Sequence, residues 1–249
     1  MGFTKSKADS NLYFKVSNSG IVILLLYVDD LFLTGDEGLI SKSKRELSAE
    51  FEMKDLGALH FFLGLEVWQE SDGIFLGQGK YTVEILQRFG MMDCKSMPTP
   101  MVSNLKLLND ALSDIVDSTI YKQMIGSLMY FTNTRPDKCF AVNTLSQFMV
   151  EPRRVHWIAT KHIMRYLKGT VEFGLRYRSN HKIILEGYTD ADWAGSVTNM
   201  KSTSGCCFSL GSAVISWLGR KQSSVALSTA EAEYMAACLA SGEAVGFGK

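Results

Sequence analysis

The segment Tyr27-Val28-Asp29-Asp30 constrains this chain more than any other. It lies between two apolar runs, residues 21–26 and 31–33. Since short β-prone runs on either side of a polar turn are typical of a hairpin, we expect an acidic β-hairpin turn here. Two adjacent carboxylates repel each other, so they destabilise such a turn unless a cation neutralises them. Mg²⁺, which proteins hold with carboxylates together with substrate phosphates, would do so; the alternative is an ordinary solvated turn.

The composition is that of a globular protein. The chain has 249 residues, 46% of them hydrophobic, which is enough for one large domain or two modest ones. Its longest apolar run, residues 21–28, is far shorter than the ~20 residues that span a bilayer. No secretory hydrophobic region follows the N-terminus. We therefore expect an intracellular protein, cytoplasmic or nuclear, that is neither secreted nor membrane-bound.

The five cysteines form no C-x-x-C pair. An odd number without paired spacing favours a reducing compartment over a disulfide framework or a zinc site.

Positive charge is concentrated in residues 151–182, although the net charge of the chain is zero. The zero net charge argues against a protein that coats nucleic acid along its whole surface. The basic segment could nevertheless follow a phosphate backbone, and a solvated helix face explains the same charges equally well. The candidate nucleic-acid-binding residues are Arg153, Arg154, Lys161, Arg165 and Lys168.

The first half of the chain alternates strands and helices. After the hairpin, which ends at residue 33, apolar periodicity and helix-stop signals predict further elements. A loop at 97–100 and a polar stretch reaching residue 118 form the best candidate for a subdomain boundary. The expected elements are a helix over 37–54, a hairpin of 59–67 with 73–76 turning at 71–73, and a helix over 80–89.

The second half changes from helices to strands. Ser228 and Glu231 have the spacing of a capping box, so a final helix begins there. Strands followed by a helix that covers them indicate a small α/β domain, and the chain as a whole is expected to be α/β (α+β). The expected elements are helices over 121–133, 137–149 and 155–168, and strands over 174–178, 183–189, 204–209 and 213–217.

A second acidic site is expected where the last helix meets a strand. Strand alternation places Tyr188, Asp190 and Asp192 on one face. Glu231 is needed for the capping box, whereas Glu233 shares its side of the helix with small alanines that allow close packing. Asp190 and Glu233 could therefore meet across a metal, as two-metal phosphodiester cleavage requires. An exposed strand end and an exposed helical glutamate are the other interpretation.

Ordered motifs extend through nearly the whole chain. The first half contains Tyr27-Val28-Asp29-Asp30, Met53-Lys54-Asp55-Leu56-Gly57, Phe62-Leu63-Gly64-Leu65-Glu66 and Asp93-Cys94-Lys95. The middle contains Ile125-Gly126-Ser127-Leu128-Met129-Tyr130, Thr134-Arg135-Pro136-Asp137 and Arg165-Tyr166-Leu167-Lys168-Gly169-Thr170. The last third contains Asp190-Ala191-Asp192-Trp193-Ala194-Gly195, Ser202-Thr203-Ser204-Gly205, Ile215-Ser216-Trp217 and Ser228-Thr229-Ala230-Glu231-Ala232-Glu233-Tyr234.

This order of motifs resembles the Pol polyprotein of copia-type LTR retrotransposons. The resemblance implies a distal reverse-transcriptase palm over residues 1–95, a mostly helical and basic thumb and connection over 96–182, and the N-terminal part of an RNase H-like domain over 183–249. It implies that Asp29 and Asp30 are catalytic palm carboxylates that bind Mg²⁺ or Mn²⁺. It implies the same for Asp190 and Glu233 in the RNase H site, and gives Asp192 no ligand role.

The resemblance also implies partners and missing ligands. The expected partner is an RNA/DNA hybrid or a primer-template, with no small-molecule cofactor and no membrane. The family's third palm aspartate would precede residue 1, and two further RNase H aspartates would follow residue 249. We therefore expect a Pol fragment that binds metal poorly and is inactive by itself, because incomplete ligand sets lose pre-organisation. The alternatives are an exon of an intact reverse transcriptase and RNase H, or a non-enzymatic nucleic-acid-binding remnant.

Overall fold

The computed structural model describes residues 1–102, 105, 113–196 and 199–247. The described part contains six α-helices and three antiparallel sheets, which confirms the expected mixture of helices and strands. The chain divides into two compact units, Met1–Leu59 with Val245–Lys249 and His60–Ala244. The part of the chain that the structure describes contains no helix that is both long and apolar enough to cross a bilayer.

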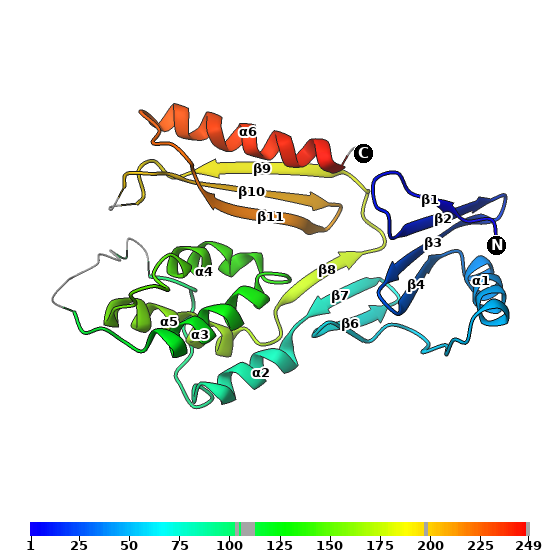
Figure 1. Ribbon diagram of the computed structural model, residues 1–249, viewed down its shortest axis with the longest axis horizontal. Helices are drawn as coiled ribbons and strands as arrows, with labels where there is room; N and C mark the ends of the chain where they lie inside the picture. The colour runs from blue at the N-terminus through cyan, green and yellow to red at the C-terminus, as the bar shows by residue number, and fades with distance from the viewer. Residues whose placement is uncertain (103–104, 106–112, 197–198, 248–249) are drawn as a thin grey trace. The chain divides into compact units, whose positions relative to one another are not determined.

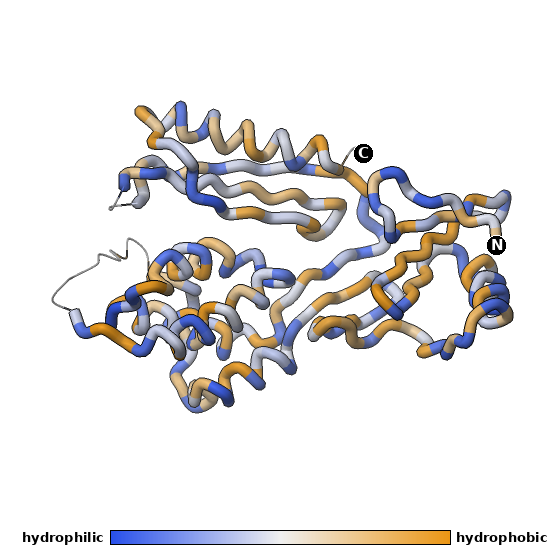
Figure 2. The backbone as a smooth tube through the Cα atoms, in the orientation of Figure 1, coloured by the Kyte–Doolittle hydropathy of each residue, from blue (hydrophilic) through white to orange (hydrophobic). Residues whose placement is uncertain are grey.

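The first unit is a four-stranded sheet with one helix. The helix α1 (Glu37–Glu50) begins at Asp36, whose carboxylate accepts a hydrogen bond from Leu39 N at 3.0 Å. It ends at Glu50 rather than at residue 54 as expected, because Phe51 is extended. Figure 2 shows an apolar β3 and a mostly hydrophilic α1. The strands pair in the order β1 (Thr4–Lys5), β2 (Leu12–Ser17), β3 (Gly20–Tyr27) and β4 (Asp30–Gly35).

The second unit opens with a sheet that joins distant segments. The expected hairpin is confirmed, with β6 (Leu65–Glu70) and β7 (Gly73–Gly77) joined at residues 71–72. β5 (Phe61–Phe62) pairs with β6 at one edge. β8 (Gly174–Arg178) pairs with β7 at the other edge. The strand at 174–178 was expected, but no local pattern predicted this partner.

The helices of the second unit enclose the main core. The fully buried side chains of the core include Tyr121, Leu128, Phe131, Leu145 and Ile163. The expected helices are confirmed with shifted ends, and the helix expected over 137–149 is a 3₁₀ turn, η1 (Pro136–Lys138), followed by a shorter α-helix. The α-helices are α2 (Gly79–Arg88), α3 (Ser118–Phe131), α4 (Cys139–Ser146) and α5 (Arg154–Gly169).

A buried polar network ties η1 to the end of α5. The guanidinium of Arg135 donates to both carboxylate oxygens of Asp137, at 3.0 and 2.8 Å, and to the Thr170 carbonyl at 2.8 Å. The Tyr166 hydroxyl donates to the same carboxylate at 2.8 Å. Burial opposes ionisation of Asp137, but the Arg135 partner outweighs it and lowers the pKa of this carboxyl. The motif at residues 134–137 thus has a structural role.

The last sheet is covered by a long helix (Figure 1). The strands lie in the order β11 (Ala213–Lys221), β10 (Thr203–Leu210) and β9 (Leu185–Ala191). In α6 (Thr229–Phe247), only Ala232 and Ala236 are buried among the described residues, so the helix packs through small side chains. The expected cap is confirmed, because Ser228 Oγ accepts from Glu231 N at 3.2 Å and Glu231 Oε2 accepts from Leu227 N at 2.7 Å.

Candidate carboxylate sites and basic helix face

The acidic hairpin turn expected at residues 27–30 is confirmed. Tyr27 pairs with Asp30, which leaves Val28 and Asp29 as the two turn residues. Val28 has a φ of 52° and 79% of its surface exposed. A β-branched residue in the left-handed region costs about 1–3 kcal/mol, and such strain is concentrated at functional sites in proteins. The turn therefore presents two adjacent carboxylates to solvent on a strained tip.

Both carboxylates of this turn are suitable ligands for a hard divalent cation. Oxygen donors on an exposed turn fit Mg²⁺ or Mn²⁺, which keep several waters when proteins bind them. Among the described residues, however, no three His, Cys, Asp or Glu side chains gather closely enough to hold a metal. Asp29 and Asp30 are thus close to each other because they are neighbours in the chain. Among the described residues, the tertiary structure brings no third ligand to them.

The second acidic site lies at the end of β9. Asp190 is paired with Gly205 of β10 and is exposed. The backbone N–H of Ala191, the next residue, donates to Glu233 Oε1 at 3.3 Å. Glu233 therefore reaches across from α6 to the strand position beside Asp190, while Glu231 is occupied by the helix cap. Asp190 thus lies on β9 and Glu233 on α6, and the Glu233 carboxylate joins the helix to the strand through its hydrogen bond with Ala191 N.

Asp192 has a structural role in the loop that follows β9. Its carboxylate accepts a hydrogen bond from Thr203 N, and its own N–H donates to the Thr203 carbonyl at 3.2 Å. A Cβ on Gly195 would lie 2.1 Å from Asp192 Oδ2, so a larger residue there would displace this carboxylate. Asp192 thus closes the loop between β9 and β10.

The basic residues of α5 form a face along the helix. Arg154, Lys161, Arg165 and Lys168 are spaced by seven, four and three residues, which places them on one side. We call these four residues the basic face. Arg154 Nη1 lies 3.9 Å from an Asp114 carboxylate oxygen.

Two residues of the basic face, and Arg153 beside it, already have contacts within the molecule. Arg165 Nε donates to the Lys95 carbonyl at 2.7 Å, and the Lys161 ammonium lies 5.3 Å from the Trp157 ring centre. Arg153 lies off the basic face at the helix N-cap. It donates to the Ser113 carbonyl at 3.0 Å and forms an ion pair with Glu151. Arg153 is therefore less available to a phosphate than the four residues of the basic face.

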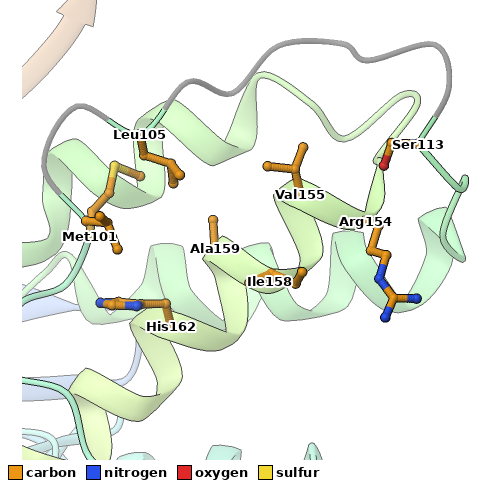
Figure 3. Close-up of a pocket in the computed structure, with 9 residues that line it drawn as sticks. Met101, Leu105, Ser113, Arg154, Val155, Ile158, Ala159 and His162 are labelled. Atoms are coloured by element: carbon orange, nitrogen blue, oxygen red, sulfur yellow. The ribbon is translucent and has the colours of Figure 1, made fainter.

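An apolar cavity of about 310 Å³ lies beside this face (Figure 3). Val155, Ile158 and Ala159 of α5 line it together with Met101 and Leu105. Met101 and His162 stand at one end, and Arg154 and Ser113 at the other. His162 Nε2 is 3.0 Å from the Thr99 carbonyl, so its imidazole is already hydrogen-bonded.

The sequence analysis did not predict the burial of two ionisable side chains, Lys138 and His156. The Lys138 side chain is fully buried with Nζ 4.6 Å from the Phe131 ring centre and, among the described residues, no hydrogen-bond partner. Burial, assisted by nearby Arg135, holds the pKa of Lys138 well below 10.5. His156 is stacked on Phe148, and burial followed by the charge of Arg153 lowers its pKa to about 4. A lysine directly after Thr134-Arg135-Pro136-Asp137 carries no local signal of burial.

Comparison with known proteins identifies the family. Residues 1–103 match the family described as reverse transcriptase (RNA-dependent DNA polymerase). Over 98% of this chain, 38% of residues are identical to the retrovirus-related Pol polyprotein from transposon RE2 of Arabidopsis thaliana. The chain belongs to the copia-type retrotransposon Pol polyprotein family. This confirms the resemblance expected from the motifs.

Further relatives define how much of a Pol polyprotein the chain represents. Identity to the Pol polyprotein from transposon TNT 1-94 of Nicotiana tabacum is 42% over 94% of this chain. The chain spans only 17% and 18% of the RE2 and TNT 1-94 polyproteins, so it corresponds to a segment of them. An uncharacterized mitochondrial protein of Arabidopsis thaliana is 42% identical, and 92% of its length is covered. No solved structure matches the chain.

Proposed function

We propose that this Pol segment carries two incomplete metal-binding carboxylate pairs, one from a polymerase site and one from an RNase H-like site. In this proposal residues 1–95 form the distal palm, 96–182 the thumb and connection, and 183–249 the start of the RNase H-like domain. The strained acidic turn carries the argument, because it lies within the matched reverse-transcriptase residues and presents both Asp29 and Asp30 to solvent.

The second pair is supported by the hydrogen bond between Ala191 N and Glu233. It brings a helical carboxylate to the strand position next to Asp190, as a shared cation would require. A bound Mg²⁺ or Mn²⁺ would neutralise phosphate charge at either pair. Since two carboxylates pre-organise a metal less well than a full ligand set, we expect dissociation constants of about 1 mM or weaker. For the same reason we propose that polymerisation and hybrid cleavage by this chain are slow.

Paramagnetic broadening by Mn²⁺ tests the metal proposal directly. We expect broadening of amide resonances around residues 27–31 and around 188–192 and 233. The double variant Asp29→Asn/Asp30→Asn should abolish only the first effect, and Asp190→Asn/Glu233→Gln only the second. Glu50→Gln, at the exposed end of α1, is the control. Broadening that survives both double variants would refute the assignment, and primer extension or hybrid cleavage at enzymatic rates would refute the expected slowness.

We further propose that the basic face contacts the phosphate backbone of an RNA/DNA hybrid or primer-template. Along α5 its residues extend over about 20 Å, the length of several phosphate spacings on one strand. Binding by this face alone, without catalysis, is the second candidate function. The five free cysteines are consistent with a reducing intracellular location, cytoplasmic or nuclear, which also remains a proposal.

Salt dependence distinguishes phosphate contacts from a solvated helix face. The variant Lys161→Glu/Lys168→Glu should weaken binding to a labelled RNA/DNA hybrid and reduce the slope of log K against log salt by about 2. Lys122→Glu, on an exposed position of α3, is the control charge reversal and should change the slope little. Fluorescence anisotropy at several salt concentrations measures both. Equal slopes for the two variants would remove the basic face from the interface.

A further inference from the structure

A second and larger cavity lies in the second unit, and no residue of either carboxylate pair lines it. Its volume is about 850 Å³, and it opens on one face of the β6–β7–β8 sheet, beside α2 and residues 171–173. The register of the sheet brings Trp68, Phe75 and Arg176 into one row across three strands. Neither the motifs nor the proposed metal chemistry accounts for this cavity.

Three aromatic rings line the cavity. The ring centres of Trp68 and Phe75 are 5.4 Å apart. A Cβ at Gly77 would lie 3.0 Å from the Phe75 ring and 3.1 Å from the Trp68 ring, so the glycine leaves room for both rings over the sheet. Phe173 forms part of the opposite wall and is 55% exposed, while Trp68 is 43% exposed. The rings are therefore accessible to a ligand.

Acidic side chains outnumber basic ones around these rings. Four glutamates line the cavity against one lysine and one arginine, which gives a formal charge of −2. Glu66 lies at the N-terminus of α2 with only 8% of its side chain exposed, and accepts a hydrogen bond from Lys80 N at 2.9 Å. Glu172, by contrast, is on the exposed surface and forms no ion pair in the described part of the chain. The cavity thus retains unneutralised negative charge at its exposed wall.

The chain's own cations contact aromatic rings and carboxylates in the cavity wall and beside it. The Lys80 ammonium lies 5.7 Å from the Phe61 ring centre and 3.8 Å from a Glu66 oxygen. The Arg176 guanidinium is held by Glu70 and Asp72 at 2.7 and 3.1 Å. The Arg135 guanidinium lies 5.3 Å from the Phe173 ring centre on the buried side. Aromatic faces next to carboxylates bind ammonium and guanidinium groups, and the same negative charge repels phosphate.

We propose that this cavity is a binding site for a cationic side chain, arginine in preference to lysine, presented by a basic segment of a partner protein. A planar guanidinium stacks on aromatic rings and hydrogen-bonds carboxylates at once, which a compact ammonium does less well. The proposal is independent of the metal sites and of nucleic-acid binding. It assigns this face of the sheet to protein recognition.

Titration of the full chain with acetyl-triarginine amide, followed by isothermal calorimetry, tests the site. We expect binding that weakens as salt is raised, tri-lysine binding several-fold weaker, and no binding of tri-glutamate. Trp68→Leu and Phe173→Leu should each weaken arginine binding by about 10-fold, and Glu172→Gln by a few-fold. Tyr234→Leu and Glu50→Gln, an exposed aromatic and an exposed carboxylate elsewhere, should leave it unchanged.

The test uses two variants with exposed side chains, so that it can still be read if one of them perturbs folding. Phe173→Leu and Glu172→Gln change exposed side chains, and circular dichroism checks that each retains the native helix content. The proposal is overturned if tri-arginine does not bind, if it binds the cavity variants as tightly as the unaltered chain, or if an oligonucleotide rather than the peptide is bound at this face.

Discussion

The helices α2–α5 and the β9–β11 sheet with α6 differ in how deeply they bury their side chains. The helices enclose large apolar residues that are fully buried, such as Tyr121, Phe131 and Ile163. In α6 only two alanines are buried among the described residues, and β9 is exposed along most of its length. Stability therefore resides in the helices, whereas the Asp190 and Glu233 pair lies on elements with little core of their own.

A core truncation in the helices should give the largest effect. Leu128→Ala removes a fully buried side chain and should lower the free energy of unfolding by about 3 kcal/mol, through lost burial and the cavity that remains. Leu227→Ala, at a leucine that is 83% exposed before α6, should change it by less than about 0.5 kcal/mol. Urea unfolding measures both. Equal losses of unfolding free energy in the two variants would contradict the conclusion that stability resides in the helices.

His156 should make the helical region sensitive to acid. Its pKa is about 4 in the folded chain, below the usual 6.5 of an imidazole, so the unfolded state binds more protons between these pH values. Stability is thus fully present above pH 6.5 and falls as the pH drops towards 4, by up to about 3 kcal/mol. Urea titrations across this range measure the slope. His156→Asn should flatten it, whereas a similar change with exposed His181→Asn would show that His156 is not the cause.

Lys138→Met should stabilise the helices. The buried amine lacks a hydrogen-bond partner in the described part, and methionine fills similar space without a desolvation cost. We expect a gain of about 2 kcal/mol near pH 7. Because the folded pKa of Lys138 is lowered, stability of the unaltered chain should rise with pH towards 10.5, and the variant should lose this rise. Lys122→Met, at an exposed position of α3, is the control.

The smallest effect should come from α6. Ala236→Gly should cost about 1 kcal/mol through helix propensity, with a small additional loss of packing. Hydrogen exchange should show α6 amides opening more readily than those of α3, since local opening follows burial. If α6 exchanges as slowly as α3, the described contacts underestimate what holds that helix.

The sequence predicted much of the secondary structure, because the signals for it are short-range. The turn at residues 27–30 follows from two apolar runs around a polar pair, and its pairing of Tyr27 with Asp30 is confirmed. The cap at Ser228 follows from a three-residue spacing. Helix ends were less predictable, since α1 stops at Glu50 where the chain becomes extended.

The sites were predictable only in part. The sequence placed Glu233 rather than Glu231 towards the strand, and the hydrogen bond from Ala191 agrees with that orientation. The occupation of Arg153 by Glu151 and Ser113 could not be read from a charge pattern, which records sign and spacing but not contacts. The assignment of metal and nucleic-acid ligands stays a prediction.

By itself the sequence determined the family, the acidic turn and most helices and strands, because these depend on residues near each other in the chain. Only the tertiary structure decided that β8 pairs with β7, that Lys138 is fully buried, and that Trp68 and Phe173 line one acidic cavity. The strand pairing and the cavity join segments about 100 residues apart. Which distant segments meet depends on two opposing terms, the free energy gained by packing and the entropy lost when the intervening loops close. Both depend on the whole chain, so no local sequence pattern predicts the outcome.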